Sequence, residues 1–135
     1  MTQQPHRALA IKPADTVVFT AMSKKYFYMR LFVTKFALEQ GAVPINPFAS
    51  FDYFLLDAVE RDTLRRANNT LVARADELWV FGDIADGVRA ELVQAWQQHK
   101  TVRFFAFRDD KHIYEVTIDD LVYEDGVEPL IHIGE

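Results

Sequence analysis

The sequence predicts a three-layer α/β/α fold with a mainly parallel sheet of about five strands. Short apolar runs rich in β-branched and aromatic residues recur along the chain, and such runs are typical of strands buried on both faces. Longer stretches with apolar residues three and four positions apart separate these runs, as expected of amphipathic helices. A chain that alternates strand and helix in this way favours parallel strands joined by right-handed crossovers.

The first half of the chain starts with a loose arm at residues 1–14, which contain two prolines and no clear period. Residues 16–20 (TVVFT) have the β-branched and aromatic character of a buried strand. Residues 26–40 contain no Gly or Pro and stop before Gly41, the residue type that favours the end of a helix. A short strand at residues 42–45 (AVPI) follows, and the Asn-Pro pair after it ends that strand.

The second half repeats the alternation after an aromatic loop at residues 46–54. We expect a helix at 55–74, a strand at 77–81 (ELWVF), a helix at 88–99, a strand at 101–107 (TVRFFAF) and a last strand at 113–117. The length suits one core, so residues 1–135 are expected to form a single domain. The whole order indicates a Rossmann-like or flavodoxin-like sheet.

The composition excludes several classes of function. A net charge of -5 gives no basic surface for a nucleic-acid polymer. The chain has no cysteine, and its four histidines are scattered without metal-ligand spacing, so no metal site is expected. No dinucleotide or Walker motif is present, so no NAD or ATP cofactor is expected. No apolar stretch approaches the roughly 20 residues of a membrane span, and we expect a cytoplasmic protein without membrane contact.

Three loops are expected to meet at the carboxyl ends of the parallel strands, where ligands bind in such sheets: residues 21–25, 46–54 and 82–87. The helix after the third loop carries Glu91 at the flank of its apolar stripe. Glu91 is either a cleft carboxylate or a half-buried glutamate that favours the positive end of the helix dipole.

Four segments resemble the nucleoside 2-deoxyribosyltransferase-like family, in particular its small uncharacterised bacterial members: VVFTA, QGAVPINPF, ADELWVFGD and DGVRAELVQAWQQHKTV. The resemblance spans residues 16–107, and its sharpest part is Gly87 four positions before Glu91. It implies that Glu91 is the nucleophile that attacks the anomeric carbon of a deoxyribose. It also implies that Asp76 contacts the base and helps to protonate it; a strand-entry aspartate that caps local amides is the alternative.

The other candidate binding residues each have two interpretations. Ala85 stands where family members acting on 5′-monophosphates carry a serine, and Asp86 beside it is expected to cap the helix or to meet a sugar hydroxyl. Ser23 with Lys24 and Lys25 forms an anion site or an exposed basic turn. Aromatic side chains of the second loop stack on a planar base or serve as lid or interface packing: Phe48, Phe51, Tyr53 and Phe54.

The function expected from the resemblance is that of an N-glycosidic-bond enzyme, either a deoxyribosyltransferase or a nucleoside or nucleotide N-glycosidase. Its partner is then a small-molecule nucleoside or nucleotide. The alternatives are a non-catalytic nucleotide-binding or sensing module of the same fold, and a structural subunit whose apolar loop serves a partner. Because family members complete their sites across subunits, the resemblance also implies a homodimer or a higher homo-oligomer.

Overall fold

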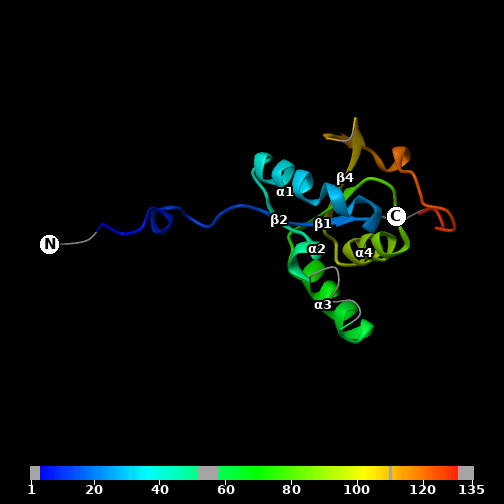
Figure 1. The fold of residues 1–135 in the computed structure, drawn as a ribbon, viewed down its shortest axis with the longest axis horizontal. Helices are drawn as coiled ribbons and strands as arrows, with labels where there is room; N and C mark the ends of the chain where they lie inside the picture. The colour runs from blue at the N-terminus through cyan, green and yellow to red at the C-terminus, as the bar shows by residue number, and fades with distance from the viewer. Residues whose placement is uncertain (1–3, 52–57, 110, 131–135) are drawn as a thin grey trace.

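A five-stranded sheet with the order β2-β1-β3-β4-β5 forms the centre of the computed structural model, which describes residues 4–51, 58–109 and 111–130 (Figure 1). β1 pairs in parallel with β2 and β3, and β3 pairs in parallel with β4, whereas β5 is antiparallel to β4. This pairing confirms the predicted mainly parallel sheet. The strands are β1 (Val17–Met22), β2 (Val43–Ile45), β3 (Glu77–Phe81), β4 (Thr101–Arg108) and β5 (His112–Val116).

Helices cover both faces of the sheet, because successive side chains of a strand point to opposite faces. In β3, Leu78 and Val80 belong to one apolar cluster, which includes α3 and α4 side chains. Trp79 and Phe81 belong to the other, which includes α1 side chains. Figure 1 shows α1 and α4 on opposite sides of the strands, as the predicted three layers require. The α-helices are α1 (Arg30–Glu39), α2 (Pro47–Ser50), α3 (Arg61–Arg74) and α4 (Asp86–Gln97).

The predicted helix at 26–40 is divided into two elements. A 3-10 helix, η2 (Lys24–Met29), follows β1 directly, and α1 continues from it. Buried Ser23 starts η2 because its side chain accepts a hydrogen bond from the Lys25 backbone N–H at 3.4 Å. The strand before it is longer than predicted, so the first loop is correspondingly short.

The predicted aromatic loop begins with the short helix α2. The Asn46 side chain accepts a hydrogen bond from the Phe48 N–H at 2.9 Å, and Pro47 occupies the first helical position. The predicted helix at 55–74 appears as α3 from Arg61 onward, while residues 52–57 lie outside the described residues. α4 lies two residues earlier in the chain than the predicted helix at 88–99, since it spans Asp86–Gln97.

The two ends of the described chain behave differently. Residues 4–16 extend away from the sheet, as Figure 1 shows, and include only a short 3-10 helix, η1 (Arg7–Ala10), without buried residues. After β5 the chain forms η4 (Ile118–Asp120) and returns to the loop after β3, where the Ile84 N–H donates to the Val122 carbonyl at 2.8 Å. None of the described helices is long and apolar enough to cross a membrane.

Candidate active site

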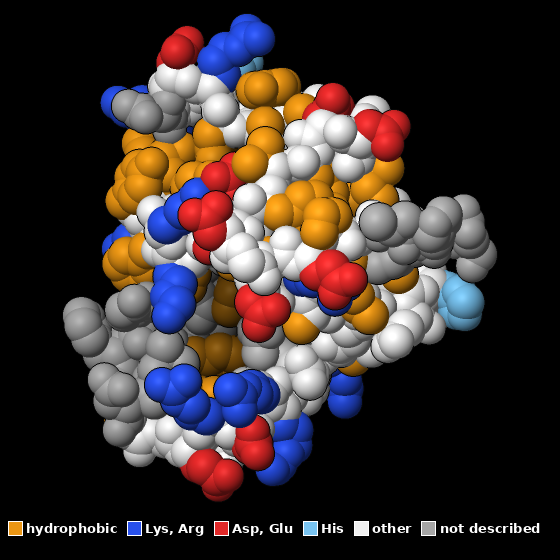
Figure 2. All heavy atoms as spheres, turned by 90° about the vertical axis from the view of Figure 1, so that its right-hand side faces the viewer, with side chains coloured by type: hydrophobic (Ala, Val, Ile, Leu, Met, Phe, Trp, Pro, Cys, Tyr) orange, Lys and Arg blue, Asp and Glu red, His pale blue; other side chains and the backbone are white. Residues whose placement is uncertain are grey.

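A cavity of about 600 Å³ lies among η2, α2, α3 and α4, at the carboxyl end of the parallel strands. Open parallel sheets bind ligands in this position. Figure 2 shows a hollow with hydrophobic side chains at its floor and Lys and Arg side chains beside it. The cavity is lined by Lys24, Pro47, Phe48, Phe51, Arg61, Leu64, Arg65, Asn68, Asn69, Asp86, Gly87, Ala90 and Glu91.

Glu91 enters this cavity from α4. The buried stripe of α4 consists of Val88, Leu92 and Ala95, and Glu91 lies half-buried at its flank, as the helical period predicts. The carboxylate oxygen Oε2 of Glu91 accepts a hydrogen bond from Nδ2 of Asn68 on α3 at 2.6 Å. The side chain therefore faces the cavity and the neighbouring helix.

The charge of Glu91 has no cationic partner among the described residues, where no Lys or Arg nitrogen forms an ion pair with it. Burial raises the pKa of Glu91 to about 7, and the hydrogen bond from Asn68 opposes this rise because it favours the ionised carboxylate. Near neutral pH the group therefore exchanges readily between its protonated and ionised forms. A titratable group of this kind in a cleft is a candidate for catalysis.

The sequence interpretation missed Asn68. It lies 23 residues before Glu91, and only the packing of α3 against α4 brings the two side chains together. One signal in the sequence was available: Asn68 and Asn69 are adjacent in the interior of a helix, where asparagine is a poor helix former. Such residues in a helix interior point to a role for their side chains.

An apolar wall faces the polar pair. Phe48 and Phe51 line the cavity from the α2 side, and Leu64 lines it from α3. The Phe48 ring packs edge-on against Phe27, with ring centroids 5.4 Å apart, so its orientation is fixed by the protein. The two other aromatic candidates, at positions 53 and 54, lie outside the described residues.

Charged side chains stand at the rim of the cavity. Lys24 projects from η2, and Arg61 and Arg65 project from the first turns of α3. Arg65 also pairs with Asp62 at 2.8 Å on the exposed surface. Asp86 and Gly87 line the cavity at the start of α4, so the structure brings both predicted binding residues to the same cavity as Glu91.

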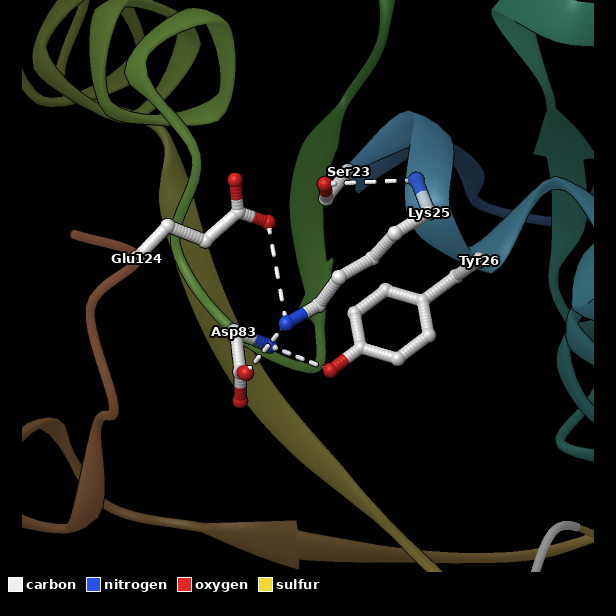
Figure 3. A network of polar contacts seen from close by, with 5 residues as sticks. All are labelled: Ser23, Lys25, Tyr26, Asp83 and Glu124. Atoms are coloured by element: carbon white, nitrogen blue, oxygen red, sulfur yellow. Dashed lines mark hydrogen bonds and ion pairs between the residues drawn. The ribbon is translucent and has the colours of Figure 1, made fainter.

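Ser23 and Lys25 belong to a different set of contacts, which Figure 3 shows. Lys25 Nζ lies 2.6 Å from an Asp83 carboxylate oxygen and 3.8 Å from Glu124 Oε2. The Asp83 N–H donates to the Tyr26 hydroxyl at 3.2 Å. Ser23 thus caps η2 and Lys25 is paired, whereas Lys24 lines the cavity. The anion site at residues 23–25 stays a prediction.

Asp76 does not lie beside Glu91 as expected. It precedes β3, at the amino end of the parallel strands, whereas the cavity is at their carboxyl end. Its side chain is exposed, and its Oδ2 accepts a hydrogen bond from the Val17 N–H at 2.8 Å. The geometry is that of the alternative, a strand-entry aspartate that caps a backbone amide. The contact of Asp76 with a base stays a prediction.

Comparisons with known proteins agree with this mainly parallel α/β fold. Residues 19–105 match the model of a family described as a domain of unknown function (DUF7768), and the chain belongs to that family. No curated protein sequence matches the chain.

Two solved structures share the fold at low sequence identity. The chain is similar to a 2-deoxyribosyltransferase from Bacillus psychrosaccharolyticus, with a TM-score of 0.59 and 15% identity over 82% of this chain and 86% of that one. It is also similar to a CMP N-glycosidase from Clostridium botulinum, with a TM-score of 0.50 and 17% identity over 73% of this chain and 75% of that one. At these identities the likeness shows the fold.

Proposed function

We propose that the chain cleaves the N-glycosidic bond of a nucleoside or nucleotide, with Glu91 as the nucleophile. The observation that carries the proposal is a cavity carboxylate held by a neutral amide, without a cation to neutralise it. The fold shared with a 2-deoxyribosyltransferase and a CMP N-glycosidase supports the same class of bond. The resemblance of residues 16–107 to the 2-deoxyribosyltransferase-like family supports it as well.

The proposed reaction has two steps. An ionised oxygen of Glu91 attacks the anomeric carbon, the carbon–nitrogen bond breaks, and the base leaves with the bonding electrons and takes up a proton from solvent. Water then attacks the same carbon and loses its proton to solvent, while the ester bond to Glu91 breaks and restores the carboxylate. A second base in place of water gives transfer instead of hydrolysis.

The rest of the cavity suits such a substrate. The apolar wall of Phe48, Phe51 and Leu64 offers flat surfaces for a base. Lys24 and Arg61 at the rim offer cations to the phosphate of a nucleotide. Asp86 and Gly87 at the start of α4 border the space beside Glu91, where the sugar would lie.

Base release from a panel of nucleosides and 5′-monophosphates tests the proposal. Wild-type protein is expected to release base, with a rate that rises between pH 6 and pH 8 as Glu91 loses its proton around pH 7. Glu91→Gln is expected to lower the rate by several orders of magnitude, because no other side chain replaces a nucleophile. Glu39→Gln, an exposed change at the end of α1, is the control and should leave the rate unchanged.

A non-catalytic nucleotide-binding module is the second candidate. Ala85 is the N-cap of α4 and makes no side-chain hydrogen bond to the helix start. In the family that the sequence resembles, members acting on 5′-monophosphates carry a serine at this position. Nucleotide that raises the melting temperature without any base release would favour this module and would refute the catalytic proposal. The expected homo-oligomer stays a prediction in either case.

A further inference from the structure

In the Asn68 carboxamide, the nitrogen makes a hydrogen bond within the protein and the oxygen makes none among the described residues. Its Nδ2 donates to Glu91 Oε2 at 2.6 Å. Its Oδ1 has no hydrogen-bond partner among the described residues, yet it is not a buried unpaired atom, and Asn68 lines the cavity. This oxygen is therefore an acceptor that a ligand in the cavity can reach.

The direction of this amide follows from the state of Glu91. An ionised carboxylate only accepts hydrogen bonds, so it selects the amide orientation in which Nδ2 faces it. The Oδ1 atom is then held on the far side of the same planar group, close to the attacking carboxylate. In the nucleophilic state of the site, Asn68 thus presents an acceptor and not a donor.

The next step rests on the proposed function. A nucleophile that displaces a base approaches the anomeric carbon from the face of the sugar opposite to the base. The Asn68 carboxamide, which is hydrogen-bonded to Glu91, is expected on that same face of the sugar. In a β-ribonucleoside, the substituent on this face next to the anomeric carbon is the 2′-hydroxyl, which a 2′-deoxyribonucleoside lacks.

We propose that Asn68 Oδ1 accepts a hydrogen bond from the 2′-hydroxyl and that the site selects ribosides over 2′-deoxyribosides. A hydroxyl supplies the donor that this acceptor needs, and hydrogen bonds to the hydroxyl next to the anomeric carbon strengthen as the sugar gains positive charge in the transition state. A bound deoxyriboside excludes water from the acceptor without supplying a donor, which costs binding free energy.

The test compares three substrates that carry the same base: the riboside, the 2′-deoxyriboside and the arabinoside, whose 2′-hydroxyl lies on the face of the base. Base release and equilibrium binding by calorimetry are measured for each with the full chain. The riboside is expected to bind about fivefold to tenfold more tightly than the other two. Equal binding of riboside and arabinoside would overturn the inference without any variant.

Variants separate recognition of the hydroxyl from positioning of Glu91. Asn68→Leu removes the acceptor, and it also lowers turnover of every substrate because Glu91 loses its hydrogen bond. That common loss cancels in the ratio of riboside to deoxyriboside turnover, which is expected to fall about tenfold relative to wild type. Thr70→Ala, an exposed change on α3, is the control and should keep the wild-type ratio.

The outcomes distinguish this inference from the proposed function. Turnover with the same ratio in wild type and Asn68→Leu would refute the inference and keep the glycosidic activity. Preferential binding of the riboside that depends on Asn68, without turnover of any substrate, would support the inference and refute the activity. Absence of both binding and turnover would refute both.

Discussion

Asp83 and Glu91, two of the carboxylates that follow strand β3, have opposite surroundings. Asp83 lies two residues after the strand and is paired with Lys25 at 2.6 Å, beside Tyr26 (Figure 3). Glu91 lies on α4 and has a neutral amide as its hydrogen-bond partner, next to a cavity. The ion pair of Asp83 links the loop after β3 to η2, which is distant in sequence. Glu91 has no cationic partner among the described residues, so its carboxylate is available to a ligand in the cavity.

Gly82 and Gly87, the glycines nearest to Asp83 and Glu91, differ in the space around them. A Cβ atom at Gly82 would lie 2.5 Å from the Tyr26 ring, and Gly82 has a φ of +77°. A Cβ atom at Gly87 would meet nothing within 4 Å. The Tyr26 and Phe107 rings thus fill the space on the Cβ side of Gly82, while the start of α4 leaves free space at Gly87.

The largest change in the free energy of unfolding is expected from a substitution at Gly82. Gly82→Ala should lower the free energy of unfolding by about 2 to 4 kcal/mol, because it adds a strained φ to a clash with Tyr26 and Phe107. Gly87→Ala should change it by less than about 1 kcal/mol, in the stabilising direction, since the position is helical and open. Urea unfolding of both variants measures this difference, and equal effects would contradict the contrast in packing.

A second prediction concerns the charge of Glu91. Its pKa is about 7 in the folded chain and 4.5 as an ordinary side chain, so folding favours the protonated form. The stability that this gives is complete below pH 4.5 and is lost as the pH rises to about 7. Between pH 5.5 and pH 8.5, Glu91→Gln should therefore become more stable relative to wild type by about 1 to 2 kcal/mol.

Unfolding curves at the two pH values measure this change. Glu39→Gln, an exposed change at the end of α1, serves as the control. A Glu91→Gln variant whose advantage is the same at both pH values would contradict this prediction, because it would show that Glu91 is already ionised at pH 5.5.

The smallest effect is expected at the paired carboxylate. Lys25→Met should lower the free energy of unfolding by about 0.5 to 1 kcal/mol at low salt, since the Lys25 and Asp83 side chains are 47% and 32% exposed and water weakens their attraction. Salt at 1 M should remove most of the difference, because it screens exposed charges. A loss that persists in high salt would mean that Lys25 stabilises the fold through packing instead of charge.

The order of strands and helices was predictable because it depends on local patterns. The apolar runs at residues 77–81 and 101–107 and the periodic helix around Glu91 each carry their own signal within a few residues. The period did not predict the division of the first helix into η2 and α1, and the Ser23 side chain caps only the start of η2.

Local patterns along the chain were therefore enough to predict the mainly parallel α/β class and the position of Glu91 at the flank of a helical stripe. The partners of the site residues depend on tertiary packing. Asn68 reaches Glu91 across 23 residues of chain, and Asp76 is drawn away to the Val17 amide, 59 residues distant. Hydrogen bonds of this kind depend on how helices and strand ends meet in space, and no period along the chain encodes that geometry.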